Sequence, residues 1–304
     1  MTLLPVKEAG MIANLSENTV RNWIEEGKLT KYEDDKGRLL VNKREILKTI
    51  PTILTFFNQK GGCGKTSSSV ICADYFEKQN DKILIVDLDQ QGTISQSFFD
   101  FDTLNSGLSL YEYIENKTPL SKIIKKYNDN IDLLPADIKL SRKDTIDTSI
   151  LIQMKEDFYP IFKKYSIVIL DCPPSLNAFS RLGVLLANYI FCPIVPEPYS
   201  FKGLAEILNS IKILTPLSKD FIDYRIFVST HRQHRTAIRE DYVTQFREQL
   251  KEKLFQNMIP DFIGIVERGV SFQNIFDMYK NDKSIIKITD LMLEIDNYIY
   301  EERK

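Results

Sequence analysis

A glycine-rich loop with two lysines constrains this 304-residue chain more than any other feature of its sequence. The loop occupies residues 57–66, carries Lys60 and Lys65, and directly follows the apolar run 53–57. A strand, a glycine turn and a helix opening at Lys65 form an anion cradle, because the helix N-terminus and successive backbone N–H groups point to one place. A plain glycine turn between a strand and a helix is the alternative. We interpret the loop as the phosphate-binding site for a nucleoside triphosphate.

The spelling of this loop departs from the usual phosphate-loop pattern, because Gln59 stands where that pattern has its first glycine. It resembles instead the deviant Walker A loop of the ParA/MinD ATPases, and in particular the form typical of ParA. In such a loop Lys65 reaches the β- and γ-phosphates of ATP and the Thr66 hydroxyl ligates Mg²⁺. The resemblance implies that Lys60 reaches across a sandwich dimer to the nucleotide of the other subunit. The implied ATP-binding residues are Lys60, Gly61, Gly62, Cys63, Gly64, Lys65, Thr66 and Ser67.

A second segment with ParA-like spelling follows the apolar run 83–86. It reads Asp-Leu-Asp-Gln-Gln-Gly over residues 87–92, with Gln90 at a position where proline is common in the family. By this resemblance Asp89 orients the attacking water and is a catalytic residue together with Lys60, while Asp87 acts on Mg²⁺ through a water molecule. Two solvated aspartates at the end of a strand are the alternative interpretation.

A third segment joins four apolar residues, 167–170, to Asp171, and two prolines follow at 173 and 174. This order predicts a Walker B strand whose carboxylate holds a Mg²⁺-bound water. The prolines stop the strand and fix the loop after it. A buried strand that ends in a capping aspartate is the alternative.

The remaining pattern predicts one α/β domain over residues 51–304. Further apolar runs occur at residues 131–134, 189–195, 225–228 and 262–266, with helical spacing between them. Alternating strands and helices predict a doubly wound, mostly parallel sheet of the P-loop NTPase type, with ligands at the carboxyl ends of the strands. Four scattered cysteines and no apolar stretch near 18 residues predict a cytoplasmic protein.

Residues 1–50 predict a separate, small winged helix-turn-helix domain. Helices over 5–13 and 17–26 are followed by a hairpin around residues 33–37 and a last helix from Asn42 to Lys48. The segment resembles the MerR/excisionase type of DNA-binding domain, whose second helix enters the major groove. The residues implied to bind DNA are Asn18, Thr19, Arg21 and Asn22. Nine Lys/Arg against eight Asp/Glu give this segment a net charge of 9 − 8 = +1, so a protein-interaction or structural role stays open.

Two arginines outside that domain resemble positions that ParA proteins use for nonspecific DNA binding. Arg235 lies in a segment, 230–239, with three arginines, two histidines and no acid, and Arg268 follows the predicted strand 262–266. A solvated surface is the alternative for both. The net charge of −2 for the whole chain favours a local DNA-binding stripe over a globally basic protein.

Together these resemblances identify the chain as a ParA-type partition ATPase with its own winged helix-turn-helix. They imply an ATP-dependent homodimer on nonspecific DNA, possible operator binding through the N-terminal domain, and a nucleoid-associated location. They also imply a centromere-binding partner of the ParB type that stimulates hydrolysis. An ATP-switched transcriptional autoregulator is an alternative. A MinD-like membrane ATPase is less favoured, because the C-terminal segment 285–304 carries acidic residues that anionic lipid would repel.

Overall fold

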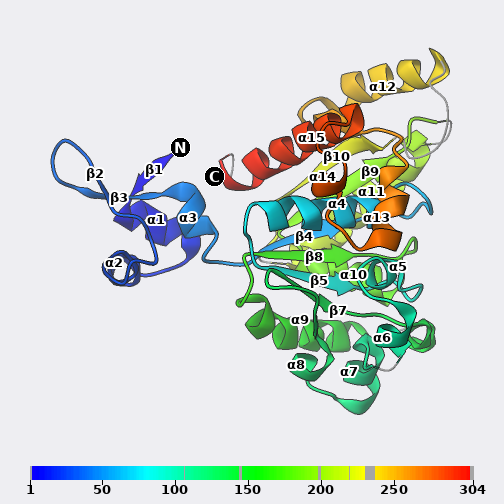
Figure 1. The fold of residues 1–304 in the computed structure, drawn as a ribbon, viewed down its shortest axis with the longest axis horizontal. Helices are drawn as coiled ribbons and strands as arrows, with labels where there is room; N and C mark the ends of the chain where they lie inside the picture. Colours follow the sequence, from blue (N-terminus) through cyan, green and yellow to red (C-terminus); the bar gives the residue numbers. More distant parts are fainter. Residues whose placement is uncertain are drawn as a thin grey trace. The chain divides into compact units, whose positions relative to one another are not determined.

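The computed structural model describes residues 2–105, 107–143, 146–197, 200–218, 220–229 and 237–301. It divides into two compact units (Figure 1). One unit comprises residues 1–52 together with 293–304, and the other comprises residues 53–292. The sequence-based boundary lay between residues 50 and 51 and did not assign residues 293–304 to the N-terminal unit.

The N-terminal unit pairs a helical hairpin with a three-stranded antiparallel sheet of order β1-β3-β2. Its helices begin where the sequence offers a capping oxygen, because Ser16 Oγ accepts the Thr19 N–H at 3.0 Å and Asn42 Oδ1 accepts the Arg44 N–H at 2.8 Å. Gly27 ends the second helix with a φ of +73°. The elements are β1 (Leu3–Pro5), α1 (Val6–Ala13), α2 (Glu17–Glu25), β2 (Tyr32–Glu33), β3 (Leu39–Asn42) and α3 (Lys43–Leu47). The helices and the hairpin occur in the predicted order, while β1 was not predicted.

The larger unit is built on an eight-stranded sheet of order β11-β10-β9-β4-β8-β5-β7-β6. β11 with β10, β10 with β9, β9 with β4, β8 with β5, and β5 with β7 pair in parallel, whereas β6 pairs antiparallel with β7 at one edge. The strands are β4 (Thr52–Phe56), β5 (Ile83–Asp87), β6 (Lys125–Lys126), β7 (Ile131–Leu134), β8 (Ile167–Asp171), β9 (Tyr189–Ile194), β10 (Asp223–Ser229) and β11 (Leu254–Ile259). The mostly parallel α/β fold predicted from the sequence is confirmed.

The helices of this unit enclose the sheet (Figure 1). Along the central strands, side chains on both faces of the sheet are buried, for example Ile83 with Leu84 and Ile169 with Leu170, because helices cover both faces. The helices are α4 (Lys65–Lys78), α5 (Thr93–Gln96), α6 (Phe101–Asn105), α7 (Leu110–Asn116), α8 (Leu120–Ile123), α9 (Thr148–Phe162), α10 (Ala178–Leu186), α11 (Ser200–Leu214), α12 (Ala237–Leu250), α13 (Gly264–Ser271) and α14 (Ile275–Met278). The last helix, α15 (Lys283–Tyr300), begins in this unit, and its residues from Leu293 onward belong to the N-terminal unit. Within the described ranges, none of the helices is both long and apolar enough to cross a bilayer.

The last strand corrects one prediction. A strand was predicted over residues 262–266, but β11 is Leu254–Ile259 and residues 264–271 form α13. Phe262 and Ile265 are buried whereas Ile263 and Val266 are 65% and 60% exposed, which is the spacing of a helix face. The true strand was overlooked because Gln256 and Asn257 interrupt its apolar pattern, as an edge strand with one partner permits.

The thiols of four cysteines lie in the interior of the larger unit. Cys63 belongs to the glycine-rich loop, Cys72 to α4, Cys192 to β9, and Cys172 directly follows β8; all four are buried. Burial raises the pKa of the thiols of Cys63, Cys172 and Cys192. Each of these three thiols is therefore a poor nucleophile in the folded chain.

Gly183 of α10 provides a test of how tightly this interior is packed. A β-carbon at this position would lie 2.4 Å from Cys172 Sγ, whereas one at Gly203 of α11 would meet nothing within 4 Å. We expect Gly183→Ala to lower the free energy of unfolding by about 1–3 kcal/mol through overpacking. Gly203→Ala is the matched control and should leave stability equal or slightly raised. Urea unfolding measures both, and a wild-type midpoint for Gly183→Ala would contradict the packing described here.

Candidate functional site

The glycine-rich loop connects β4 to α4 and is held in place from both ends. Gly62 and Gly64 adopt left-handed φ values of +72° and +96°, which residues with a β-carbon rarely adopt. At the start of the loop, Asn58 Oδ1 accepts the Lys60 N–H at 2.8 Å and Asn58 Nδ2 donates to the Pro193 carbonyl at 2.7 Å. Asn58 therefore anchors the loop to β9, a role that the sequence interpretation did not assign to it.

Lys65 and Thr66 open helix α4 at the carboxyl end of the sheet. Lys65 is buried, and its Nζ donates to the Lys60 carbonyl at 3.1 Å, so the ammonium lies along the loop that precedes it. The Thr66 hydroxyl donates to Asp171 Oδ2 at 2.7 Å, and the Ser69 hydroxyl donates to Asp171 Oδ1 at 2.9 Å. Two hydroxyls of α4 thus fix the carboxylate at the end of β8, and the structure brings Thr66 and Asp171 together.

Asp87 ends the neighbouring strand β5 and is fully buried. Its Oδ2 accepts the Ser95 hydroxyl at 2.6 Å and the Ser95 N–H at 3.2 Å, and its Oδ1 accepts the Asp89 N–H at 3.0 Å. Burial, followed by repulsion from Asp171, raises the pKa of Asp87 to about 8. Burial also raises the pKa of Asp171 to about 6, against the lowering effect of its two hydroxyl donors. Two adjacent carboxyl groups that are costly to ionise together favour a bound cation.

Asp89 lies at the start of the turn that leads into α5. Its Oδ1 accepts the Gln91 N–H at 3.0 Å and its carbonyl accepts the Gly92 N–H at 2.9 Å, so the turn itself fixes the carboxylate. Its side chain lines the same cavity as Lys65 and Thr66. The catalytic and metal-binding positions predicted on three separate segments therefore meet at one end of the sheet, with Lys60 as the exception described below.

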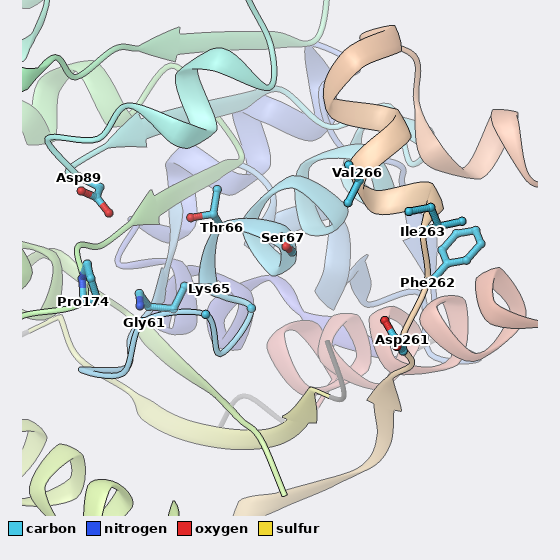
Figure 2. A pocket seen from close by; sticks show the side chains of 12 residues that line it. Gly61, Lys65, Thr66, Ser67, Asp89, Pro174, Asp261, Phe262, Ile263 and Val266 are labelled. Carbon is cyan, nitrogen blue, oxygen red and sulfur yellow. The ribbon is translucent and has the colours of Figure 1, made fainter. Parts of the chain in front are cut away.

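A cavity of about 700 Å³ opens above the loop, which is within the usual size range of small-molecule sites (Figure 2). Figure 2 shows Gly61, Lys65, Thr66, Asp89 and Pro174 on one side and the segment 261–266 on the other. The first side carries the polar side chains of Lys65, Thr66 and Asp89. The second side presents three apolar side chains together with the carboxylate of Asp261. The lining residues are Gly61, Gly62, Gly64, Lys65, Thr66, Ser67, Asp89, Pro174, Asp261, Phe262, Ile263 and Val266.

The second side of this cavity was missed by the sequence analysis. Phe262, Ile263 and Val266 belong to the segment that was predicted to be a strand. The available signal was the three- and four-residue spacing of apolar positions after Pro260. A cavity with a phosphate loop on one side and apolar side chains on the other has the chemistry to hold a nucleotide, with its phosphates and its base at opposite sides.

Lys60 behaves differently from the other predicted ATP-binding residues. It is not among the residues that line the cavity, and its ammonium forms an ion pair with Glu197 on a side chain that is 53% exposed. Cys63, which belongs to the same loop, is buried and does not line the cavity either. Gly61, Gly62, Gly64, Lys65, Thr66 and Ser67 do line it.

The residues of this site fit a magnesium ion. A threonine hydroxyl and buried carboxylates converge beside the phosphate loop, and oxygen donors of this kind are those that Mg²⁺ prefers. Thr66 would hold the ion directly, and Asp87 and Asp171 would act through its water molecules.

The predicted DNA-binding residues fall into three groups. Asn18, Arg21 and Asn22 are exposed on α2 and Thr19 is partly exposed there, with Arg21 paired to Glu17 at 2.7 Å. Arg235 lies outside the described residues. Arg268 lies in α13 and is 1% exposed, because both carboxylate oxygens of Asp74 accept hydrogen bonds from its guanidinium. A buried and paired guanidinium cannot contact a DNA phosphate, so the assignment of Arg268 to a DNA-binding surface is wrong.

The sequence of the larger unit matches a described family. Residues 51–223 match the family described as AAA domain (AAA_31). The chain is 28% identical over 220 residues to the chromosome-partitioning ATPase Soj of Treponema pallidum, covering 70% of this chain and 85% of that protein. It is 26% identical over 225 residues to the sporulation initiation inhibitor protein Soj of Bacillus subtilis, covering 71% of this chain and 86% of that protein.

Solved structures share the fold. Cobyrinic acid a,c-diamide synthase from Mycobacterium smegmatis, with a bound ATP analogue and magnesium, superposes with a TM-score of 0.70 at 21% identity. That comparison covers 84% of this chain and 98% of the synthase. A plasmid partition protein from Borrelia burgdorferi gives a TM-score of 0.62 at 19% identity, covering 81% of this chain and 99% of that one.

Proposed function

The chain belongs to the AAA domain family, as a P-loop ATPase similar to ParA and Soj, and from this premise we propose that it is a DNA-partition ATPase. It uses ATP and Mg²⁺. In our proposal ATP binding drives a sandwich homodimer that holds nonspecific DNA. A centromere-binding partner of the ParB type then stimulates hydrolysis and release, and the dimer works on the nucleoid in the cytoplasm.

The observation that carries the dimer proposal is the position of Lys60. Its ammonium lies outside the cavity that its own loop builds and pairs with Glu197, whereas Lys65 stays along the loop. A lysine that belongs to a phosphate loop but does not line the cavity beside that loop is placed to contact the nucleotide bound by a second subunit. A cation delivered across the dimer would offset the charge that develops on the transferred phosphoryl group. This supports the interpretation of the loop as a deviant Walker A motif.

The other roles follow from the contacts in the site. Lys65 binds the β- and γ-phosphates, and Asp171 fixes the Thr66 hydroxyl through a hydrogen bond of 2.7 Å. Bound Mg²⁺ neutralises phosphate charge. Asp89, held by the Gln91 N–H, orients the attacking water, and Asp87 supports it through the Asp89 N–H.

The N-terminal unit is proposed to be a winged helix-turn-helix that binds DNA in a sequence-dependent way. Support comes from the order of its helices and hairpin, and from the exposure of Asn18, Arg21 and Asn22 on α2. A net charge of 9 − 8 = +1 over residues 1–50 gives one copy little electrostatic affinity. Two copies in a dimer are therefore the proposed binding form.

We expect the two DNA-binding surfaces to respond differently to mutation. Arg235→Ala should weaken binding to any duplex and reduce its salt dependence, because the proposed contact is to phosphate. Arg21→Ala and Asn22→Ala should change sequence preference by about 1–3 kcal/mol per lost base contact. The measurement is binding of random and upstream DNA by the full chain over a salt series with ATP, and Lys78→Ala on α4 is the surface control.

Two results would contradict this division. Random-duplex affinity that is equal with ATP, with ADP and without nucleotide would remove the ATP-dependent dimer from the proposal. Unchanged random-duplex affinity in Arg235→Ala, together with its loss on deletion of residues 1–50, would leave the N-terminal unit as the sole DNA contact.

An ATP-switched transcriptional autoregulator is the second candidate, because the N-terminal unit exposes a polar helix face. A footprint on the DNA upstream of the gene, compared with and without ATP, separates the two. A discrete footprint that ATP changes while hydrolysis is dispensable would favour the regulator.

A further inference from the structure

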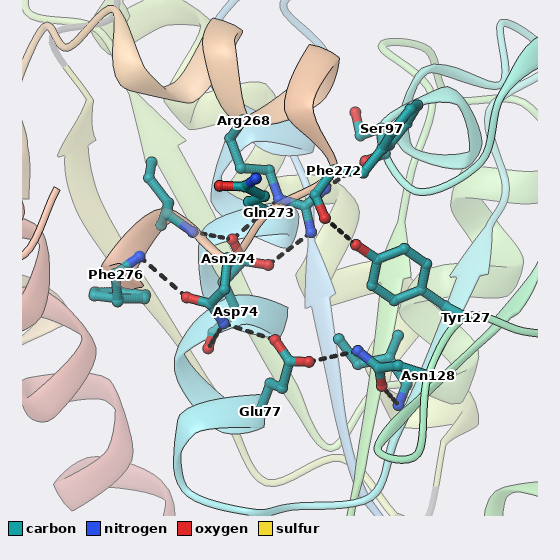
Figure 3. A network of polar contacts seen from close by, with 12 residues as sticks. Asp74, Glu77, Ser97, Tyr127, Asn128, Arg268, Phe272, Gln273, Asn274 and Phe276 are labelled. Carbon is teal, nitrogen blue, oxygen red and sulfur yellow. Dashed lines mark hydrogen bonds and ion pairs between the residues drawn. The ribbon is translucent and has the colours of Figure 1, made fainter. Parts of the chain in front are cut away.

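One buried arginine ties three segments of the larger unit together. The guanidinium of Arg268 in α13 donates from Nε to Asp74 Oδ2 at 3.0 Å and from Nη2 to Asp74 Oδ1 at 2.7 Å. Its Nη1 donates to the Ser97 carbonyl (Figure 3). The centroid of the Phe98 ring lies 4.2 Å from the guanidinium carbon. Arg268 therefore joins α13 to α4 and to the end of α5.

The ion pair within this network is almost completely removed from solvent. The side chains of Arg268 and Asp74 are 1% and 0% exposed. Asp74 Oδ2 also accepts the Ile275 N–H at 2.9 Å, and its carbonyl accepts Asn274 Nδ2 at 2.8 Å. Because both charges are buried and satisfied, loss of either partner alone would leave a costly unpaired charge.

The helix that carries Arg268 also contributes to the nucleotide cavity. Val266 and Ile263 line the side of the cavity opposite the phosphate loop, and Val266 precedes Arg268 by two residues in the same helix. A ligand that contacts this apolar side therefore contacts α13, the helix that carries Arg268.

The contact of Arg268 with Ser97 lies at the end of α5, the helix that follows the turn carrying Asp89. Ser97 is the C-cap of α5, and Ser95 within this helix holds Asp87 through two hydrogen bonds. Gly92 is the N-cap of α5, and its N–H donates to the Asp89 carbonyl at 2.9 Å. Hydrogen bonds from Ser95 and from the N-cap Gly92 thus connect α5 to Asp87 and Asp89. Arg268 holds the other end of this short helix through the Ser97 carbonyl.

We propose that Arg268 is a positioning residue that couples occupancy of the apolar side of the nucleotide cavity to the placement of Asp89. The inference rests on the proposed role of Asp89 in hydrolysis. Through Asp74 the arginine fixes α13 against the helix of the phosphate loop, and through Ser97 it fixes the turn that carries the water-orienting carboxylate. It acts on turnover without touching the nucleotide.

Arg268→Lys is the informative variant. A lysine keeps the positive charge beside Asp74, but a single ammonium cannot reproduce the planar fork that serves Asp74 and the Ser97 carbonyl together. We expect ATP affinity within about threefold of wild type and a kcat that is lower by roughly tenfold to a hundredfold, as small misplacements of catalytic groups produce. Single-turnover ATPase rates and titration with a fluorescent ATP analogue give the two quantities separately.

A second variant covers the case in which Arg268→Lys does not fold. Asp74→Asn/Arg268→Met removes both charges and keeps an acceptor for the Ile275 N–H, so no unpaired charge is buried. It should lose kcat to a similar extent. Lys78→Met is the matched control, since it removes an exposed ion pair with Asp277 of α14 from the same helix α4 without reaching α5, and its kcat should stay within about twofold.

A double-mutant cycle with Asp89→Ala identifies the route. If Arg268 acts through Asp89, Arg268→Lys should have no further effect on the residual rate in the Asp89→Ala background. An equal loss in both backgrounds, a folded Arg268 variant with wild-type kcat, or a loss of ATP affinity alone would overturn the inference. If Asp89→Ala by itself retains wild-type turnover, the proposed function of Asp89 fails first, and that result is visible without any Arg268 variant.

Hydrogen exchange of the wild-type chain gives a readout that does not depend on any variant. ADP binding should raise the protection of the backbone amides of residues 92–97, because an occupied cavity stabilises α13 and, through Arg268, the end of α5. Unchanged protection in this segment, alongside raised protection in residues 61–66, would overturn the coupling.

Discussion

Lys65→Ala is expected to reduce ATP binding below detection, a loss on the order of a hundredfold or more. The structure places this lysine along the phosphate loop, buried at the polar side of the cavity. Among the described residues, no other lysine lines the cavity. Calorimetric titration with Mg·ATP measures the effect. Lys78→Ala at the other end of α4 is the matched control and should bind normally, because its side chain is exposed and paired to Asp277.

Retention of wild-type ATP affinity by Lys65→Ala would refute the assignment of the phosphate loop. A folding defect would be recognised separately by a lowered midpoint of thermal unfolding. Because the loop conformation is set by Gly62, Gly64 and Asn58, the truncation should leave the fold intact.

Lys60→Ala and Asp89→Ala are expected to separate hydrolysis from assembly. Lys60 lies outside the cavity, so its alanine variant should bind ATP normally yet lose hydrolysis, since its proposed contact is made across the dimer. Asp89→Ala should hydrolyse ATP about a hundredfold or more slowly and accumulate as an ATP-bound dimer, because only the orientation of water is removed.

Sedimentation velocity with ATP, paired with ATPase assays, measures both variants. An Asp89→Ala chain that binds ATP but stays monomeric would refute this division of roles. Lys60→Ala with wild-type turnover would instead remove the cross-dimer role of that lysine and leave the P-loop assignment untouched.

Much of the fold could be predicted from the sequence because central strands are covered on both faces and therefore appear as unbroken apolar runs. The strands that end in Asp87 and Asp171 were predicted in this way. The edge strand β11 was not, because polar residues are tolerated where one side is open. Of the eight loop residues that the resemblance implied for ATP binding, six line the cavity, whereas Lys60 and Cys63 do not.

The rest depended on contacts between distant parts of the chain. Arg268 and Asp74 are 194 residues apart, and only the folded chain shows that the arginine is internal. An arginine near the end of a strand has the same appearance in a sequence whether it faces DNA or a buried carboxylate. The apolar side of the cavity was missed for a related reason, since its residues look like core until the neighbouring helix is placed.

The reactivity of the four buried cysteines can report local opening of the folded chain. Each thiol marks a different structural element, namely the phosphate loop, the helix after it, the end of β8 and strand β9. A thiol reagent can modify each of them only during a fluctuation that exposes that element, so the four modification rates measure four local opening free energies. Without any engineered label, the rates at Cys63 and Cys192 would reveal whether nucleotide rigidifies the loop alone or the sheet beneath it.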